Sequence, residues 1–529
     1  MRRLIASPIL QACVVLTLAL ALFVPGLGTS GYAHAEAFRV QPAYEMMQRG
    51  DYITVRLFEQ AYLRKPPGMP WAIALSTYIF GAGEFASRLV SAVAVAIGAL
   101  VSLAFVNRWF GKPFGLVAGL AFVLAPAFWW YPPIARSAEI EALHNTFVAI
   151  GALCILQTFM PLRFGETRSW LRTLLLACAT TLGVTGAFFT KGPAGVPVFA
   201  GACLAGYLLR MRATGNAVSN VRTWIAALAP FGIAAGLLVW WAWAAHRRVA
   251  GESIVLESPT LFLFRPQQLL EIASLPVAVL IAALPTSLGV LAIAFYRSGI
   301  ALRAGNPASA RAALALLLTI GFAILGYMLT GVSNNRYALP AVALMPAACG
   351  AAAWVLVWRA QTLTESARNA EHSRLKRFAL ILVTLLLAGA VFSAWYGEHR
   401  RNTRTSGKAF GVELGEYLTR PAELWADQVI DTRPEVVMAA VDIARTHNIA
   451  IRARWMPVSL WRREHGEASV PMPPVGSYVL LRTDDLPRRD QYELDEEHEY
   501  AHVMPRLREV HRGMVHNFEY RLYEVIASD

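Results

Sequence analysis

Long blocks of apolar residues recur along this chain, and several reach the roughly 20 residues needed to cross the ~30 Å hydrocarbon core of a bilayer. Of its 529 residues, 56% are hydrophobic and only 16% are charged, whereas about a quarter of the residues in a soluble domain are charged. The apolar residues form continuous blocks and lack the spacing of an amphipathic helix. The sequence therefore predicts an α-helical polytopic membrane protein.

The lengths of the blocks predict about eleven transmembrane helices. We expect them at residues 8–26, 87–107, 113–131, 142–160, 172–190, 194–210, 223–245, 271–296, 312–331, 337–358 and 378–396.

Clusters of basic residues occupy alternate loops between these blocks. Cytoplasmic loops carry an excess of Lys and Arg, so the net charge of +13 indicates topology and disfavours a nucleic-acid partner. The amino terminus is then cytoplasmic, and an odd number of spans places the carboxyl terminus outside. The clusters run over residues 2–3, 108–112, 163–172, 210–222, 297–311 and 359–377.

The first block has a second interpretation. Arg2 and Arg3, the apolar run and the small-residue sequence Ala33-His34-Ala35 together resemble a secretory signal peptide. The apolar run is long for a signal peptide, and the candidate cleavage sequence lies far beyond its end. A retained first span is therefore favoured.

Composition predicts two domains. Residues 1–396 form the transmembrane domain, in which residues 27–86 are a long first outside loop with amphipathic helices. Its segment Trp71 to Phe80 is apolar but too short to cross alone, so an interfacial or re-entrant helix is expected. From residue 397 to residue 529 charges become dense, and strand-like runs such as Ser477 to Arg482 alternate with helical patterns. This part is predicted to be a soluble, extracytoplasmic α/β domain.

Charged residues at the outer face of the membrane are candidates for function, because burying them is costly. In the first outside loop these candidates are Glu36, Arg64 and Lys65. In later outside segments they are Arg136, Glu139, Glu141, Lys191 and Arg336.

Four short motifs carry a resemblance to a known family. They are Glu36 to Arg39 followed by Gly50-Asp51-Tyr52 and Tyr62-Leu-Arg64-Lys65-Pro66-Pro67, then Ile134 to Ala142, Thr190-Lys191-Gly192-Pro193, and Arg336-Tyr337-Ala-Leu-Pro340. In this order the pattern resembles the polyprenyl-phosphate-dependent GT-C glycosyltransferases, which include lipid A aminoarabinose transferases and protein O-mannosyltransferases. The resemblance covers about residues 30 to 345. It implies a GT-C-like fold in a bacterial inner membrane.

The resemblance also implies a reaction. A sugar would pass from a polyprenyl-phosphate donor to a lipid, glycan or protein acceptor at the outer face, by a single displacement with inversion. The leaving phosphate needs cations to stabilise its charge, a role for Lys65, Arg64, Arg136, Lys191 or Arg336. The acceptor hydroxyl needs a carboxylate base, a role for Glu36, Glu141 or Glu139.

Two positions depart from the family pattern. Relatives commonly have Asp-Glu where this chain has Ala35-Glu36, and Glu-Lys-Pro where it has Arg64-Lys65-Pro66. The second change removes an acidic residue that can contribute to a metal site, so no cofactor is predicted and a divalent metal is doubtful.

Structural interpretations stay open beside these roles. Asp51 after Gly50 is typical of a turn, and Glu139 and Glu141 are expected on different faces of a helix, with only one turned inward. Arg136, Lys191 and Arg336 are also plausible as interfacial anchors. His144 and His246 are interpreted as packed or interfacial side chains, without a metal.

Two other classes of function remain as alternatives. A transporter or flippase of a lipid-linked substrate would line its path with the same charges, but near the midplane of the bilayer. A membrane-anchored binding protein acting through its terminal domain would leave the outer motifs without a role.

Overall fold

The computed structural model describes residues 7–32, 34–125, 134–160, 170–214, 221–250, 254–255, 269–284, 286–303, 307–330, 338–361, 384, 388, 406–427, 434–456, 473–482, 506–515 and 518–527. By their contacts the residues group into two compact units. Unit 1 comprises Met1–Pro25, Arg88–Ala242 and Ser258–Gly397, and unit 2 comprises Gly26–Ser87, Trp243–Glu257 and Glu398–Asp529. The first outside loop therefore groups with the carboxyl-terminal residues, whereas the domain boundary at residue 396 stays a prediction.

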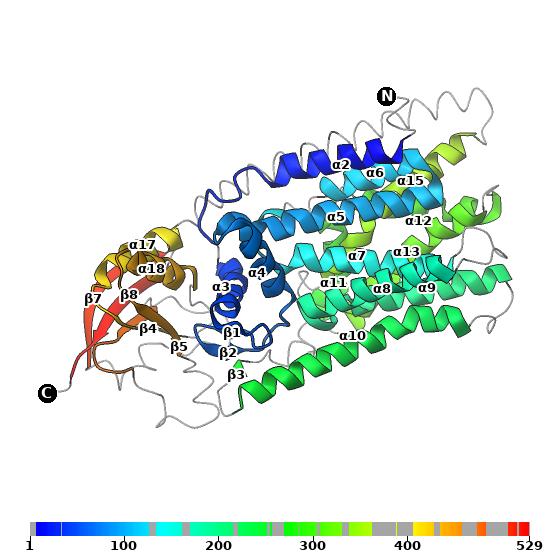
Figure 1. Cartoon of the computed structure of the whole chain (residues 1–529). Helices are drawn as coiled ribbons and strands as arrows, with labels where there is room; N and C mark the ends of the chain where they lie inside the picture. The colour runs from blue at the N-terminus through cyan, green and yellow to red at the C-terminus, as the bar shows by residue number, and fades with distance from the viewer. Residues whose placement is uncertain are drawn as a thin grey trace. The chain divides into compact units, whose positions relative to one another are not determined.

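Unit 1 is helical, and Figure 1 shows its long helices running side by side. They are α2 (Pro8–Phe23), most of α5 (Glu84–Phe110), α6 (Lys112–Val123), α7 (Ile140–Phe159), α8 (Trp170–Lys191), α9 (Val196–Thr214), most of α10 (Val221–Arg248), α11 (Leu269–Ala282), α12 (Ser287–Arg303), α13 (Pro307–Leu329) and α15 (Met345–Gln361). Short 3-10 helices join some of them, at Ile134–Arg136, Gly192–Gly195 and Leu339–Leu344.

Within the described part of the chain, six helical stretches are long and apolar enough to cross a bilayer: Glu84–Phe110, Ile140–Phe159, Trp170–Arg212, Thr223–Arg248, Ala308–Leu329 and Leu339–Val357. Pro8–Phe23, Lys112–Val123 and Ile272–Ile281 are apolar but shorter. The predicted span at 378–396 falls almost entirely outside the described residues. The architecture is that of a multi-pass membrane protein, and the exact number of spans stays a prediction.

The stretch Trp170–Arg212 holds 43 residues, about twice the length that one crossing requires. Gly192, with φ at 64°, ends α8 in a conformation that residues with a Cβ seldom adopt. Both α8 and α9 pack against α7, so the chain reverses at Gly192. Two spans were predicted here, at 172–190 and 194–210.

The predicted single span at 271–296 is instead two helices, α11 and α12. Helix α11 ends at Ala282, and α12 begins only at Ser287. Pro285 lies between them in the sequence, and proline has no N–H to continue a helical hydrogen-bond ladder. Hydropathy did not detect this break, because apolar residues continue on both sides of the proline.

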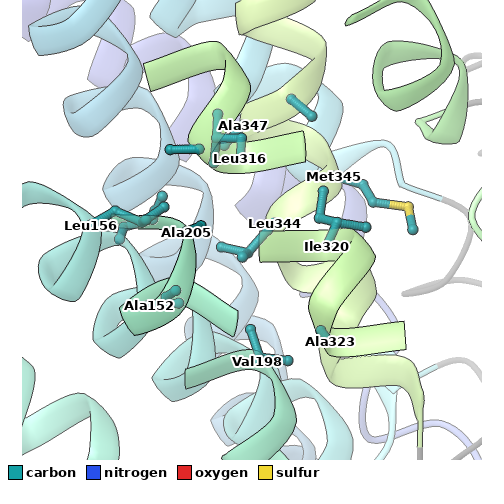
Figure 2. Close-up of a cluster of buried hydrophobic side chains, with 14 of the residues drawn as sticks. Ala152, Leu156, Val198, Ala205, Leu316, Ile320, Ala323, Leu344, Met345 and Ala347 are labelled. Carbon is teal, nitrogen blue, oxygen red and sulfur yellow. The ribbon is translucent and has the colours of Figure 1, made fainter. Parts of the chain in front are cut away.

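Small residues let helices of unit 1 approach closely. A Cβ on Gly183 of α8 would lie 2.4 Å from the backbone nitrogen of Gly151 in α7, and one on Gly186 would lie 2.5 Å from the ring of Phe147. Glycines at helix contacts allow such backbone approach in membranes. Beside this contact, Ala152 and Leu156 of α7 belong to a buried cluster with residues of α9, α13 and α15 (Figure 2).

Gly183→Val is therefore expected to force α7 and α8 apart and to destabilise unit 1 by about 1–3 kcal/mol, the usual cost of overpacking. Thermal unfolding of the purified protein in detergent measures this effect. Gly232→Val is the matched control, because a Cβ at Gly232 of α10 meets no atom within 4 Å. Equal melting temperatures for the two variants would contradict the close contact.

Unit 2 begins with the first outside loop, which folds into two helices and a small sheet. The helices are α3 (His34–Arg49) and α4 (Gly68–Phe80), and the strands are β1 (Arg56–Leu57) and β2 (Gln60–Tyr62). Strand β2 also pairs in parallel with β3 (Ile254–Val255), which follows α10. The segment Trp71 to Phe80, predicted to be helical, lies in α4, and its position at the membrane surface stays a prediction.

The carboxyl-terminal residues of unit 2 form a five-stranded mixed sheet in the order β5-β4-β6-β8-β7. The strands are β4 (Ala422–Asp427), β5 (Ile451–Met456), β6 (Tyr478–Arg482), β7 (Leu507–Val515) and β8 (Phe518–Val525), and the helices are α17 (Ser406–Tyr417) and α18 (Pro434–Thr446). The strand-like run predicted at Ser477 to Arg482 is strand β6.

Candidate functional site

The predicted site residues divide between the two units. Unit 1 holds Arg136, Glu139, Glu141 and Lys191, whereas unit 2 holds Glu36, Arg64 and Lys65. Arg336 falls outside the described residues.

In unit 1 the structure brings Glu141 and Lys191 together. Lys191 Nζ lies 3.3 Å from Glu141 Oε1, and the two side chains are only 4% and 2% exposed. Glu141 is in the first turn of α7 and Lys191 in the last turn of α8, so each charge also opposes the partial charge at its own helix end. This buried ion pair joins two residues that the sequence predicted separately.

His144 lies one turn beyond Glu141 and is fully buried. Its Nδ1 is 3.1 Å from the carbonyl oxygen of Ala187 and 3.1 Å from Thr190 Oγ1, both on α8. Together with the Glu141 to Lys191 pair and the Gly151 to Gly183 approach, this contact sets the register of α7 against α8. The prediction that His144 is a packed side chain is confirmed.

Glu139 directly precedes α7 with an extended backbone, and its carbonyl oxygen accepts a hydrogen bond from Ser91 Oγ at 3.4 Å. Glu139 and Glu141 are both 2% exposed. The expectation that only one of the two carboxylates turns inward is therefore wrong, because both are buried. The helical spacing argument does not apply, because Glu139 lies outside the helix.

Arg136 is held at the end of α2. Its guanidinium donates hydrogen bonds to the carbonyl oxygens of Leu22, at 2.9 Å, and of Pro25, at 2.6 Å. The last carbonyls of a helix lack partners within the helix, and arginine commonly supplies them. This geometry supports the structural interpretation of Arg136, while its phosphate-binding role stays a prediction.

In unit 2, Arg64 and Lys65 lie in the short segment between β2 and α4. Two prolines follow them, and α4 begins at Gly68 with Pro67 as its N-cap residue. The indole nitrogen of Trp71 donates to the carbonyl oxygen of Tyr52 at 2.7 Å, which fixes the first turn of α4. Arg64 is exposed and Lys65 is half-buried. The two cations therefore lie between strand β2 and the fixed first turn of α4.

Glu36 lies in the first turn of α3 and is 2% exposed. Two residues later, the ring of Phe38 stacks on that of Tyr62 in β2, with centroids 6.0 Å apart. This stacking ties the helix that carries Glu36 to the strand that precedes Lys65. Glu36 is thus a buried carboxylate.

Sequence reasoning missed Glu45, which supports the hairpin of β1 and β2. The hairpin turns through Phe58 and Glu59 with φ at 50° and 69°, a conformation usually left to Asn and Gly. Glu45 Oε1 accepts from the N–H of Phe58 at 2.6 Å, and Oε2 accepts from the N–H of Glu59 at 3.0 Å. One carboxylate therefore holds both strained residues. Burial raises the pKa of Glu45, although the hydrogen bonds to its ionised form act in the opposite direction.

Glu45→Gln is expected to destabilise unit 2 by about 1–3 kcal/mol, because a buried charge-assisted acceptor is lost. Limited proteolysis should then cut within residues 55–62 faster than in the parent protein, and thermal unfolding should begin earlier. Glu416→Gln, on an exposed face of α17, is the control and should behave as the parent. Unchanged proteolysis of the Glu45 variant would show that the hairpin holds without the carboxylate.

Glu59 also connects the hairpin to the carboxyl-terminal sheet. Its carboxylate lies 2.7 Å from Arg454 Nη1 and 2.5 Å from Arg452 Nη2, both in β5, and 3.4 Å from Arg49 Nη2 at the end of α3. A network of several charges contributes more than an isolated surface pair. The outside loop and the terminal sheet are thereby joined within unit 2.

Asp51 acts in a turn, as predicted. Its Oδ1 accepts from the N–H groups of Ile53, at 3.0 Å, and Thr54, at 3.3 Å, and forms an ion pair with Arg248 Nη1 at 2.6 Å. Burial alone would raise the pKa of Asp51, but the hydrogen bonds from Thr54 and Ile53 and the charge of Arg248 together lower it.

A lowered carboxyl pKa stabilises the folded state above the unfolded pKa, and this contribution is lost as the pH falls through the folded pKa. Asp51→Asn is therefore expected to be less stable than the parent at about pH 7, with the difference shrinking toward about pH 3. Thermal unfolding at both pH values measures it. A difference that grows on acidification would contradict the ionised state of Asp51.

Arg88 is a second buried ion that the sequence interpretation passed over. It is 1% exposed, near the start of α5. The signal was present, since Arg88 is the one charged residue between Glu84 and Arg108, and a charge inside a span is a candidate for function.

Among the described residues, no three His, Cys, Asp or Glu side chains gather closely enough to hold a metal ion. The cations Lys65, Arg64 and Lys191 have the chemistry to bind a phosphate without one. Metal dependence stays a prediction.

The fold and these residues can be compared with known proteins. A family profile described as dolichyl-phosphate-mannose-protein mannosyltransferase matches residues 64–243. An undecaprenyl phosphate-alpha-4-amino-4-deoxy-L-arabinose arabinosyl transferase of Pseudomonas aeruginosa is 29% identical over 123 residues, which are 21% of this chain and 22% of that protein. The match thus spans little more than a fifth of this curated relative.

Two solved structures resemble the whole chain. ArnT from Cupriavidus metallidurans bound to undecaprenyl phosphate has a TM-score of 0.59 at 16% identity, covering 96% of this chain and 97% of that one. The arabinofuranosyltransferase AftD from Mycobacteria has a TM-score of 0.53 at 17% identity, covering 100% of this chain and 40% of that one. These similarities establish a shared fold, and the profile match falls on the predicted motif region. The chain thus shares its fold with these two proteins, and its residues 64–243 resemble the mannosyltransferase family.

Proposed function

We propose that this chain is a glycosyltransferase that moves a sugar from a polyprenyl-phosphate donor to a lipid, glycan or protein acceptor, by inverting single displacement. The observation that carries this proposal is the likeness over nearly the full length of both chains to ArnT, which was solved with undecaprenyl phosphate bound. The reaction would take place at the outer face of a bacterial inner membrane. The amino terminus would then be cytoplasmic and the carboxyl-terminal α/β domain outside, as the alternation of basic loops predicts.

The residues support a division of roles. Lys65, assisted by Arg64, would bind the donor phosphate, because both project from a rigid segment at the start of α4, where helix N–H groups also favour an anion. The buried carboxylates Glu36 and Glu141 are the candidate bases, with Glu139 as a third. Lys191 would orient Glu141 through their 3.3 Å contact, and Lys191, Arg136 and Arg336 are further candidates for binding a phosphate.

A transfer assay tests the proposal. Purified protein in nanodiscs would be given radiolabelled undecaprenyl-phosphate sugars together with an acceptor extract of membrane lipids and proteins. Label should appear in the acceptor fraction with the anomeric configuration inverted. Movement of intact labelled donor across the bilayer, without any transfer, would establish a flippase and refute the enzyme.

A further inference from the structure

Unit 2 has an open cavity of about 440 Å³, within the roughly 300–1,000 Å³ that is usual for small-ligand sites. Its walls come from α3, the turn at residues 82–84 and the helices α17 and α18. Figure 1 labels these helices, and α18 contacts α3. The cavity therefore lies between the first outside loop and the carboxyl-terminal residues, all within unit 2.

One wall is a fixed set of hydroxyl groups. The hydroxyls of Tyr32 and Tyr44 lie 3.0 Å apart, and Tyr32 is also 3.1 Å from Ser87 Oγ. The N–H of Gly83 donates to the Tyr44 hydroxyl at 2.9 Å. These bonds hold both rings in place, so the wall is formed before any ligand arrives.

Other lining side chains recognise hydroxyl groups. Asp442 and Glu435 of α18 offer acceptors, Arg445 offers donors, and Gln48 of α3 offers both. A sugar hydroxyl donates and accepts at once, so this mixture suits a polyol. Met47, Met438 and Ile443 add apolar surface for the C–H faces of a sugar ring.

The charges around the cavity disfavour an anion. Three carboxylates face two cations, and the cations are engaged: Lys408 Nζ is 2.6 Å from Glu84 Oε1, and Arg445 Nη1 is 3.3 Å from Asp442 Oδ1. A phosphate would need surplus positive charge. A neutral or amine-bearing ligand does not.

The adjoining space favours a ligand longer than one ring. A second cavity of about 200 Å³ shares Tyr44, Gln48, Met438, Asp442 and Arg445 with the first. We propose that unit 2 binds a neutral or amine-bearing oligosaccharide in this pair of cavities. Binding there goes beyond the proposed transfer and can be measured without it.

Saturation-transfer NMR on the full chain in nanodiscs tests this site. The probes are diacetylchitobiose and mannobiose as neutral sugars, glucosamine as an amine, mannose 6-phosphate as an anion, and a Ser-rich octapeptide. The neutral sugars and glucosamine are expected to give saturation-transfer signals, which show binding. The double variant Gln48→Ala with Asp442→Asn should weaken their binding at least ~10-fold, or about 1.4 kcal/mol. Glu416→Gln, exposed on α17 and absent from both cavities, should bind as the parent does.

The outcomes separate this proposal from the transferase. Sugar binding should persist in the Lys65→Ala variant even where sugar transfer is lost. The proposed binding site would also remain supported if the protein transferred sugar from none of the donors. Thermal unfolding confirms that each variant is folded, and Gln48→Ala alone, at an exposed position, gives a second variant. Absence of binding in the folded parent, equal binding in the cavity variants, or preference for the phosphosugar or the peptide would each overturn the proposal.

Discussion

Lys65→Ala is expected to lower kcat of sugar transfer by about 10²–10³-fold, the usual cost of removing one preorganised group that stabilises developing charge. The leaving group of the proposed reaction is a phosphate, and Lys65 lies where β2 ends and α4 begins, supported on both sides. Two prolines and the anchored Trp71 follow it, so the segment that carries Lys65 and Arg64 is held in place. Initial rates with a saturating lipid donor measure the effect.

Lys65→Arg is the informative companion variant, because it keeps the charge and changes the geometry. It should retain more activity than the alanine variant, whereas Glu416→Gln should retain all of it. Alanine activity above about a tenth of the parent value would remove Lys65 from the phosphate site.

Lys191→Met is expected to destabilise the protein by about 3–5 kcal/mol, because it removes the cation that lies 3.3 Å from the buried carboxylate of Glu141. Glu141→Gln should lower the free energy of unfolding by a similar amount, because it removes the carboxylate that lies beside the buried ammonium group of Lys191. The double variant Glu141→Gln with Lys191→Met removes both charges and should recover most of that stability. Thermal unfolding of the four proteins completes the cycle.

Transfer activity of the same four proteins then separates two roles for Glu141. A base contacts the acceptor, so activity should stay lost in the stable double variant. If Glu141 and Lys191 only join α7 to α8, activity should return together with stability. Full additivity of the two stability losses would show that the 3.3 Å contact contributes no coupling.

Much of the membrane architecture follows from one-dimensional information. Hydropathy located the helices from α5 to α10, since a span must be continuous and apolar, and it indicated that Trp71 to Phe80, now part of α4, is too short to cross. It failed at α11 and α12, where the separating signal was the single Pro285. A proline inside an apolar run is ambiguous, because α10 and α11 contain Pro230 and Pro276 without ending there.

The sequence indicated several residues of the candidate site, but it did not indicate which of them contact one another. Glu141 and Lys191 were each identified as charges at the edge of a span, but their contact depends on the register of α7 against α8. That register is set by Gly151, Gly183 and the His144 contacts, which are tertiary. The turn at Phe58 and Glu59 was invisible, because neither residue is typical of positive φ and the stabilising group, Glu45, lies 13 residues away.

The contacts of Glu59 bear on the order in which parts of unit 2 can fold during synthesis. The hairpin leaves the ribosome long before its partners Arg452 and Arg454, since Glu59 and Arg452 are 393 residues apart, and β2 also needs β3, which follows α10. Synthesis proceeds from the amino terminus. A nascent or truncated chain therefore lacks the contacts that steady Lys65, so full competence would arise only after the carboxyl-terminal sheet has been made and folded.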